Sequence, residues 1–322
     1  MIARAITRLA SDYKRRSLPS PNLVYYLWRF VANGVRTGRA ITARVVYPDT
    51  PAIAHQLRDH GIAVGPSDGF LTDEGRRQLA ASSTELSRVA GSESVQAIIN
   101  GTGPASSRQK EFLIHLASFE EGVPADSGLL KLALDPKLLE IVAGYLGLWP
   151  CLHSIGAWLN FPTDEPAALS QLWHRDPEDL RLVKVFIYLS DVGEESGPFT
   201  YIPDTHPFGR AAVVARKYEK KKRLPDDQME RLFPPESWRV CTGPAHTMIL
   251  ADTIGYHRGG KPSVGRRMLI TFTYTSGISF VDRPMGIVGD PGWITAPIQE
   301  CAARALKSAA APEPRKKKKA GR

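Results

Sequence analysis

The apolar residues of this chain change their spacing at Pro150, and this change limits most strongly what the chain can fold into. Before Pro150 they recur every three or four positions, the period of helices that bury one face. After it they form five short runs rich in β-branched and aromatic residues, separated by Gly, Pro, Asp and Ser. Several short strands joined by loops favour a barrel or jelly roll over a parallel sheet. The runs cover residues 151–161, 182–192, 197–203, 246–253 and 266–275.

Capping residues place two helices in the stretch 50–150. Thr72 precedes two acidic residues, a pattern typical of a helix N-cap and first turn. Asp135 followed by Pro136 starts a second helix, and Gly147 is placed to end it. The sequence therefore predicts an α+β protein with a mainly β core, on which helices from the N-terminal half pack.

Size and composition suit one domain. The 322 residues, 43% of them hydrophobic, suffice for one sizeable core. We expect this domain over residues 45–308, helical over 50–150 and with its β core over 151–280. A charged segment, 216–239, interrupts the strand pattern and is interpreted as an inserted helix or excursion.

The same composition excludes other classes of protein. No apolar run approaches the roughly 18 residues of a membrane span, and the N-terminus lacks the apolar stretch of a secretory signal. Cys151, Cys241 and Cys301 are far apart, and their odd number argues against a disulfide framework. The expected compartment is therefore the reducing cytoplasm.

The net charge of +9 belongs to the two ends of the chain. Residues 1–44 hold nine Lys or Arg and one acidic residue, and residues 311–322 hold six and one. The middle of the chain, 45–310, holds 27 basic and 31 acidic residues, a balance of −4. A domain that binds nucleic acid would carry its basic surface on the folded body, so no specific nucleic-acid partner is expected.

Two interpretations of the basic ends stay open. In one, the amphipathic N-terminal segment 1–44 forms a helix that packs on the body, and the low-complexity tail 309–322 is a disordered extension. In the other, the ends make weak contact with an anionic membrane, with Tyr25, Tyr26, Trp28 and Phe30 at the lipid interface. The second interpretation places a cytoplasmic protein peripherally at the membrane.

A His-x-Asp pair is the first sign of chemistry. In an extended segment His174 and Asp176 point to the same side, so both can reach one metal ion. His257 lies between two of the predicted strands, and its neighbouring glycines allow close approach of the backbone to a ligand. Two histidines and one carboxylate on one face of an ion leave open positions and suit iron(II) and oxygen chemistry.

An arginine follows His257 by ten residues, at the head of the last predicted strand. A buried guanidinium there can hold a small dicarboxylate with two hydrogen bonds. Arg267 shares its face with Thr271 and Thr273, as in a polar pocket, whereas Arg266 shares its face with apolar residues. We therefore favour Arg267 and keep Arg266 as the alternative. Asn160, on the strand before His174, is interpreted as a contact to the same ligand or as a strand-end hydrogen bond.

Residues 158–274 resemble the phytanoyl-CoA dioxygenase family. The resemblance rests on four segments in the same order and spacing: WHRD at 173–176, VKVFIYLSDVGEESGPFTYIPDTH at 183–206, GPAHTMILADTIGYHRGG at 243–260 and RRMLITFTY at 266–274. It implies a double-stranded β-helix, a jelly roll with helices packed on it. It also implies that His174, Asp176 and His257 bind Fe(II), and that Arg267 binds the distal carboxylate of 2-oxoglutarate.

The function implied by this resemblance is an Fe(II)- and 2-oxoglutarate-dependent dioxygenase. It would use O2, release succinate and CO2, and act on a small-molecule or lipid-like substrate. Relatives that halogenate lack the carboxylate at the position of Asp176, so its presence favours hydroxylation or desaturation. Two alternatives remain: a metal-binding jelly roll without turnover, acting as a sensor or scaffold, and an adaptor that binds membranes or nucleic acid through the basic ends.

Overall fold

The structure is a computed structural model, and it describes residues 21–43, 49–102, 112–117, 119, 122–212, 223–281, 286–303 and 307–308. The N-terminal residues 1–20 and the lysine-rich tail 309–322 lie outside these ranges, so the interpretations of both stay predictions. The charged segment 216–239 is described from residue 223 onward, and it includes the short helix α10 (Asp226–Glu230).

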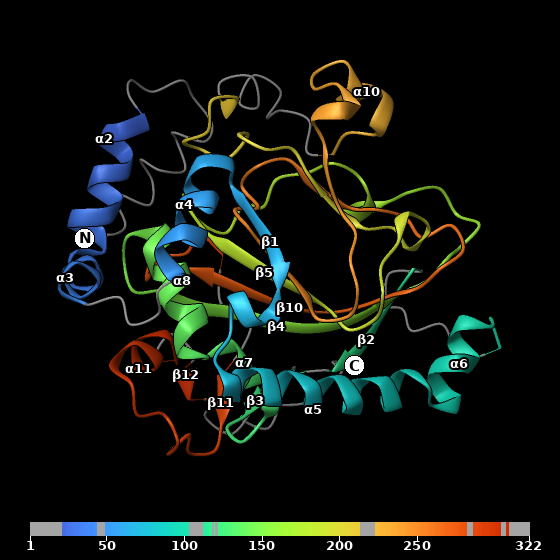
Figure 1. Ribbon diagram of the computed structural model, residues 1–322, viewed down its shortest axis with the longest axis horizontal. Helices are drawn as coiled ribbons and strands as arrows, with labels where there is room; N and C mark the ends of the chain where they lie inside the picture. Colours follow the sequence, from blue (N-terminus) through green and yellow to red (C-terminus); the bar gives the residue numbers. More distant parts are fainter. Residues whose placement is uncertain are drawn as a thin grey trace, which may run out of the picture.

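A six-stranded antiparallel sheet forms the centre of the molecule (Figure 1). Every neighbouring pair in this sheet is antiparallel. The order is β1 (Ile62–Pro66), β8 (Thr247–Ala251), β5 (Val183–Tyr188), β10 (Arg267–Thr275), β4 (Cys151–Asn160) and β2 (Leu113–Ala117). Two of its strands, β1 and β2, come from the stretch 50–150, where the sequence pattern indicated helices.

Two smaller sheets accompany it. The first is antiparallel, in the order β7 (Arg239–Cys241), β6 (Phe199–Tyr201) and β9 (His257–Gly259). The second is parallel, in the order β12 (Lys307–Ser308), β11 (Gly286–Val288) and β3 (Val123–Pro124). Each of the five predicted runs contains a strand, namely β4, β5, β6, β8 and β10. The prediction of a mixed α and β protein with antiparallel sheets is therefore confirmed.

The large sheet has a different partner on each face, because side chains alternate along its strands. One face packs against the small sheet β7-β6-β9 through an apolar cluster that includes Tyr188, Leu269 and Phe199. The other face, with Val185, Ile270 and Phe272 among its residues, belongs to the main hydrophobic core that the helices complete.

The helices lie around this core (Figure 1). Their bounds are α2 (Pro21–Tyr26), the π-helical turn η1 (Leu27–Ala32), α3 (Gly34–Thr42), α4 (Thr50–His60), α5 (Asp73–Ala90), α6 (Glu93–Ile99), α7 (Gly128–Ala133), α8 (Pro136–Leu146) and α11 (Pro297–Ala303). Short 3-10 turns occupy Ser67–Gly69, Leu169–Gln171, Glu194–Ser196 and Pro235–Ser237. Among the described residues, no helix is both long enough and apolar enough to cross a membrane.

The predicted helix ends are confirmed. The Thr72 hydroxyl accepts a hydrogen bond from the Gly75 N–H at 3.0 Å, and Asp135 accepts one from the Leu138 N–H at 3.1 Å. Gly147 ends α8 with φ of 70°, a left-handed conformation that costs glycine little.

The described part of the N-terminal segment packs on the body. Trp28 is buried, and its indole N–H donates to the Asp179 carboxylate at 2.9 Å. Asp179 is fully buried, and burial raises the pKa of this carboxyl to about 6. Arg36 donates to the carbonyls of Trp149, Pro150 and Cys301. These contacts agree with the interpretation in which the N-terminal helix is part of the folded domain. The expectation that Trp28 lies at a lipid interface is wrong, because its side chain is buried against Asp179.

Replacing Trp28 with Phe keeps an aromatic side chain but removes the indole N–H that donates to Asp179. A hydrogen bond to a buried charged group contributes about 1.5–3 kcal/mol, so we expect the free energy of unfolding to fall by about 2 kcal/mol. Urea denaturation at neutral pH measures this. Val35→Ala, at a side chain 75% exposed on the neighbouring helix, is the control and should change stability by less than about 0.5 kcal/mol. Equal stability of Trp28→Phe and wild type would contradict the assigned role of the indole.

Candidate metal centre

His174, Asp176 and His257 come together in space although up to 83 positions separate them in sequence. His174 donates its backbone N–H to the His257 carbonyl at 2.9 Å, and His257 returns a hydrogen bond at 3.1 Å. The Asp176 N–H donates to the Thr253 carbonyl at 2.8 Å. The segment 174–176 is thereby fixed beside β9, and one ligand atom from each of the three side chains lies within 4.8 Å of the others.

The two imidazoles present the same nitrogen to this centre. Nδ1 of His174 lies 2.8 Å from the Leu172 carbonyl, and Nδ1 of His257 lies 3.0 Å from the Gly255 carbonyl. A carbonyl only accepts, so each Nδ1 carries the proton and each Nε2 keeps its lone pair. Nε2 of His174 and of His257 lie 3.8 Å and 3.6 Å from the Asp176 carboxylate. This is the tautomer that metal-binding histidines adopt.

The electrostatics of the site favour neutral imidazoles and an ionised carboxylate, the protonation states that bind a metal ion. Burial lowers the pKa of His174, and burial together with His174 lowers the pKa of His257 to about 3. Burial alone would raise the pKa of Asp176, but the Lys184 ammonium and then the two imidazoles hold this pKa well below its ordinary value. At neutral pH the site therefore offers two neutral imidazoles and one carboxylate, the ligand forms that a divalent ion requires.

A cavity of about 370 Å³ opens in front of His174 and His257. Its wall is the face of the large sheet that turns toward β6 and β9. The wall is formed by side chains that share one face of three neighbouring strands. They are Ser154, Trp158 and Asn160 from β4, Lys184, Phe186 and Tyr188 from β5, and Arg267, Leu269, Thr271 and Thr273 from β10. Its size falls within the range of small-molecule sites.

Arg267 is the most unusual residue of this wall. Its side chain is 5% exposed, and neither Nε nor Nη1 has a hydrogen-bond partner among the described residues. Burial lowers the pKa of the guanidinium to about 10, which still leaves it charged at neutral pH. A Cβ on Gly259 would lie 2.9 Å from Nη2, so the glycine makes room for the guanidinium. Buried donors without partners are costly, and an anion bound in the cavity would satisfy them.

The other predicted site residues differ in whether they line the cavity. Arg266 lies outside the cavity and donates to the Gln96 side chain at 3.3 Å in an exposed contact. Asn160 is buried, lines the cavity and is the β4 residue opposite Arg267. Trp158 lines the cavity and donates its indole N–H to the Thr271 hydroxyl at 2.9 Å. Arg175 points away from the centre, toward the carbonyl of Ile254, as alternation along the segment predicts.

Sequence reasoning missed Lys184 and Glu178, which both line the cavity. The signal for Lys184 was present, because alternation along its strand puts it on the same face as Phe186 and Tyr188, which also line the cavity. Glu178 follows Asp176 by two positions, the same spacing that joins His174 to Asp176. Both were overlooked because charged residues between apolar ones are usually solvent-exposed.

No protein-family model matches this chain, and no curated protein matches it in sequence. Solved structures similar to it include the non-heme α-ketoglutarate-dependent epimerase SnoN from nogalamycin biosynthesis, at 18% identity over 71% of this chain and 84% of that one, with a TM-score of 0.46. The apo form of EctD from S. alaskensis has 17% identity over 84% and 93%, with a TM-score of 0.48.

A third structure, HygX from Streptomyces hygroscopicus with nickel and 2-oxoglutarate bound, has 17% identity over 73% of this chain and 88% of that one, with a TM-score of 0.44. Likenesses at this level assign neither a family nor an activity to this chain.

The geometry of the three side chains predicts one divalent metal ion per chain. His257→Ala removes a ligand, and we expect the affinity for Co(II) to fall by at least about 100-fold, because loss of an outer contact alone costs 10–100-fold. Isothermal titration of the metal-free protein measures this. His55→Ala, on the exposed face of α4, is the matched control. Unchanged Co(II) binding by His257→Ala would contradict the assigned metal site.

Proposed function

We propose that this chain is an Fe(II)- and 2-oxoglutarate-dependent dioxygenase that hydroxylates a small-molecule or lipid-like substrate. In the balanced reaction, one oxygen atom of O2 enters a C–H bond of the substrate and the other enters succinate, while 2-oxoglutarate loses CO2. The observation that carries the proposal is the buried guanidinium of Arg267, whose Nε and Nη1 have no hydrogen-bond partner among the described residues, in the same cavity as the candidate ligands His174 and His257.

Iron bound at His174, Asp176 and His257 would supply the activation of dioxygen and the oxidation of the C–H bond. The contribution of the chain is to hold three ligands and leave the other positions open, as two histidines and one carboxylate do in non-heme iron oxygenases. Hydrogen bonds to the Leu172 and Gly255 carbonyls fix both ring orientations before metal binds.

Arg267 is proposed to bind the distal carboxylate of 2-oxoglutarate. Its Nε and Nη1, which have no hydrogen-bond partner among the described residues, are N–H donors available to the carboxylate oxygens. Asn160 lies opposite Arg267 across the strand pair and is proposed as a second contact at this end. Phe199 and Phe186, with ring centroids 4.3 Å apart, and Trp158 supply apolar surface that limits access of water.

The antiparallel sheets facing each other across this cavity support the proposal of a double-stranded β-helix, with the metal site between the two sheets. The alternative function, a sensor or scaffold that binds metal without turnover, also needs the three ligands. It does not need the buried Arg267 guanidinium beside them. A buried cation whose donors lack partners lowers stability unless a ligand satisfies it.

The direct test is release of succinate from 2-oxoglutarate by the Fe(II)-loaded protein, aerobically and anaerobically, against a panel of small metabolites. We expect succinate only in the presence of O2. Arg267→Ala should raise the apparent KM for 2-oxoglutarate by at least about 30-fold, because loss of a buried charge-assisted pair costs on the order of 2–5 kcal/mol.

Arg266→Ala is the matched control for this measurement, since Arg266 is exposed and lies outside the cavity. Its KM should stay within about twofold of wild type. A larger effect of Arg266→Ala would reverse the assignment of the two arginines, and no effect of either would reject 2-oxoglutarate as the co-substrate.

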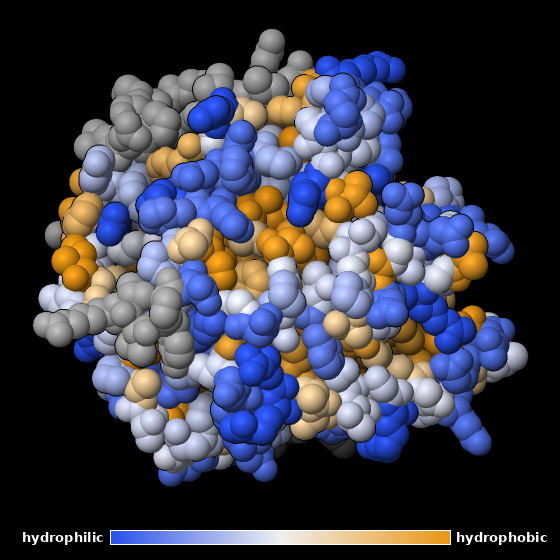
Figure 2. Space-filling model, viewed as in Figure 1, coloured by the Kyte–Doolittle hydropathy of each residue, from blue (hydrophilic) through white to orange (hydrophobic). Residues whose placement is uncertain are grey.

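We also propose weak contact of the N-terminal region with an anionic membrane. Of the eleven large apolar side chains that are exposed among the described residues, five lie on α2, η1 and α3. This N-terminal face consists of Tyr26, Phe30, Val31, Val35 and Ile41, which are 46% to 75% exposed. Apolar surface gathers at the left edge of the molecule in Figure 2, where Figure 1 places α3.

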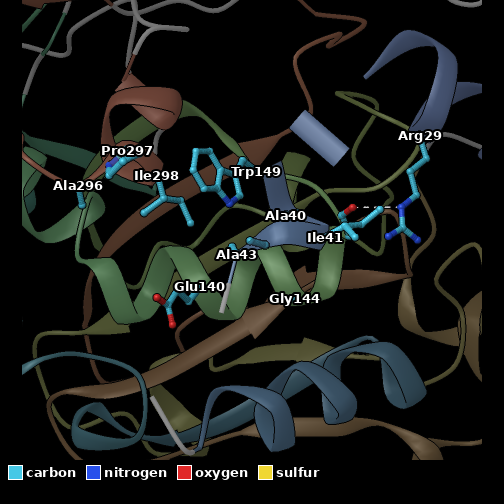
Figure 3. Close-up of a pocket in the computed structure, with 12 residues that line it drawn as sticks. Arg29, Ala40, Ile41, Ala43, Glu140, Gly144, Trp149, Ala296, Pro297 and Ile298 are labelled. Atoms are coloured by element: carbon cyan, nitrogen blue, oxygen red, sulfur yellow. Dashed lines mark hydrogen bonds between the residues drawn. The ribbon is translucent and has the colours of Figure 1, made fainter. Parts of the chain in front are cut away.

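Two further features fit a lipid surface. Residues 21–43 contain three arginines and no acidic residue, a charge complementary to anionic headgroups. Beside Ile41 lies a largely apolar groove of about 430 Å³ between α3, α8 and α11, lined by Ala43, Gly144, Trp149 and Ile298 (Figure 3). A face that is apolar at its centre and basic in its sequence surroundings is typical of interfacial helices.

Co-sedimentation of the full-length protein with vesicles containing 30% phosphatidylserine tests this contact. We expect binding at low salt that weakens at high salt, because surface charges are screened. The variant Tyr26→Ser/Phe30→Ser/Ile41→Ser should bind at least about fivefold less. The control Val240→Ser/Val264→Ser changes two exposed valines elsewhere and should bind like wild type. Wild-type protein that stays in the supernatant at low salt would reject the membrane contact.

A further inference from the structure

A second carboxylate, besides that of Asp176, lines the cavity of the metal site. Glu178 follows Asp176 by two positions, and its side chain is 17% exposed. The Lys184 ammonium lies between the two acids, 2.5 Å from one Asp176 oxygen and 4.0 Å from one Glu178 oxygen. The Glu178 carbonyl accepts hydrogen bonds from the Phe280 N–H and the Ser279 hydroxyl. The Glu178 backbone is therefore fixed, and only its side-chain torsions remain to move the carboxylate.

A second carboxylate beside a divalent ion is a hazard for the proposed chemistry. Carboxylates bind such ions readily, so Glu178 is a candidate fourth ligand. Three protein ligands leave three of six positions, which suffice for a chelating 2-oxoglutarate and for dioxygen. Four protein ligands leave two, and the co-substrates would then compete.

Lys184 is placed to prevent this. The cation gives Glu178 a partner within the cavity wall and takes up one oxygen of Asp176. The group of metal-ligating atoms that lie together comprises His174, Asp176 and His257, without Glu178.

We propose that Lys184 is a positioning residue that keeps Glu178 from coordinating the metal and so preserves the open positions of the site. The inference rests on the proposed function, because it assumes a metal at the three ligands. It assigns Lys184 a role beyond neutralising the charge of Asp176.

The experiment measures the affinity of metal-free, full-length protein for Co(II), and then the affinity of the Co(II) form for 2-oxoglutarate, both by isothermal titration. Lys184→Met removes the ammonium that lies between Asp176 and Glu178. We expect Co(II) to bind at least about 10-fold more tightly and 2-oxoglutarate at least about 10-fold more weakly than in wild type. Lys184→Arg, which keeps the charge, should stay within about threefold of wild type in both.

A second substitution separates coordination from charge. Lys184→Met/Glu178→Asp keeps the negative charge but shortens the side chain by one methylene, which reduces the reach of the carboxylate toward the three ligands. We expect this double variant to return both affinities to within about threefold of wild type. If charge alone were responsible, it would behave like Lys184→Met, and the proposal would be wrong. Lys184→Gln is measured in parallel, so that the result does not depend on the folding of one variant.

The outcomes distinguish this inference from the function on which it rests. Failure of the wild-type protein to bind Co(II), or binding that survives His257→Ala, overturns the metal site and the inference together. Wild-type binding that depends on His257 but does not respond to Lys184→Met overturns the role of Lys184 alone.

Discussion

The site depends on two backbone hydrogen bonds that His174 and His257 exchange across an antiparallel bridge. They join the segment after the 3-10 turn Leu169–Gln171 to β9, an edge strand of the small sheet. The side chains of two directly opposed residues lie close together, so the bridge itself brings the two imidazoles to a ring-centroid distance of 4.2 Å. Asp176, two residues on, is carried to the same place by its own bond to Thr253.

Burial then gives this arrangement its chemical character. Burial lowers the pKa of both imidazoles. It also leaves Nε and Nη1 of the charged Arg267 without a hydrogen-bond partner among the described residues. The two cations of the cavity lie toward opposite ends of its wall. Arg267 and Thr273, the residue opposite Lys184, are six positions apart on β10, which corresponds to about 20 Å along the strand. One end of the wall is suited to a carboxylate, and at the other end Lys184 contacts Asp176, one of the three candidate ligands.

The N-terminal segment is tied to the same region. Trp28 donates to Asp179, three residues after Asp176, and Asp179 also accepts the backbone N–H groups of Leu180 and Ser276. A buried carboxylate with these donors fixes the chain between the metal-site segment and β5. The exposed side of the same segment, α2 to α3, carries apolar side chains. One short segment therefore both packs against the chain that follows Asp176 and presents an apolar surface to the outside.

The sequence by itself determined the local elements and the candidate residue types. Strand runs, the caps at Thr72 and Asp135 and the His-x-Asp pair are set by neighbours a few positions apart, so spacing reveals them. Alternation along β10 likewise separated Arg267 from Arg266. Only the tertiary structure decided what lies opposite what. The strands β1 and β2 within a helical stretch, the exchange of hydrogen bonds between residues 174 and 257 and the position of Lys184 between two acids depend on contacts between distant segments. No local pattern encodes such contacts, because they form only when strand register and burial of the whole core are set together.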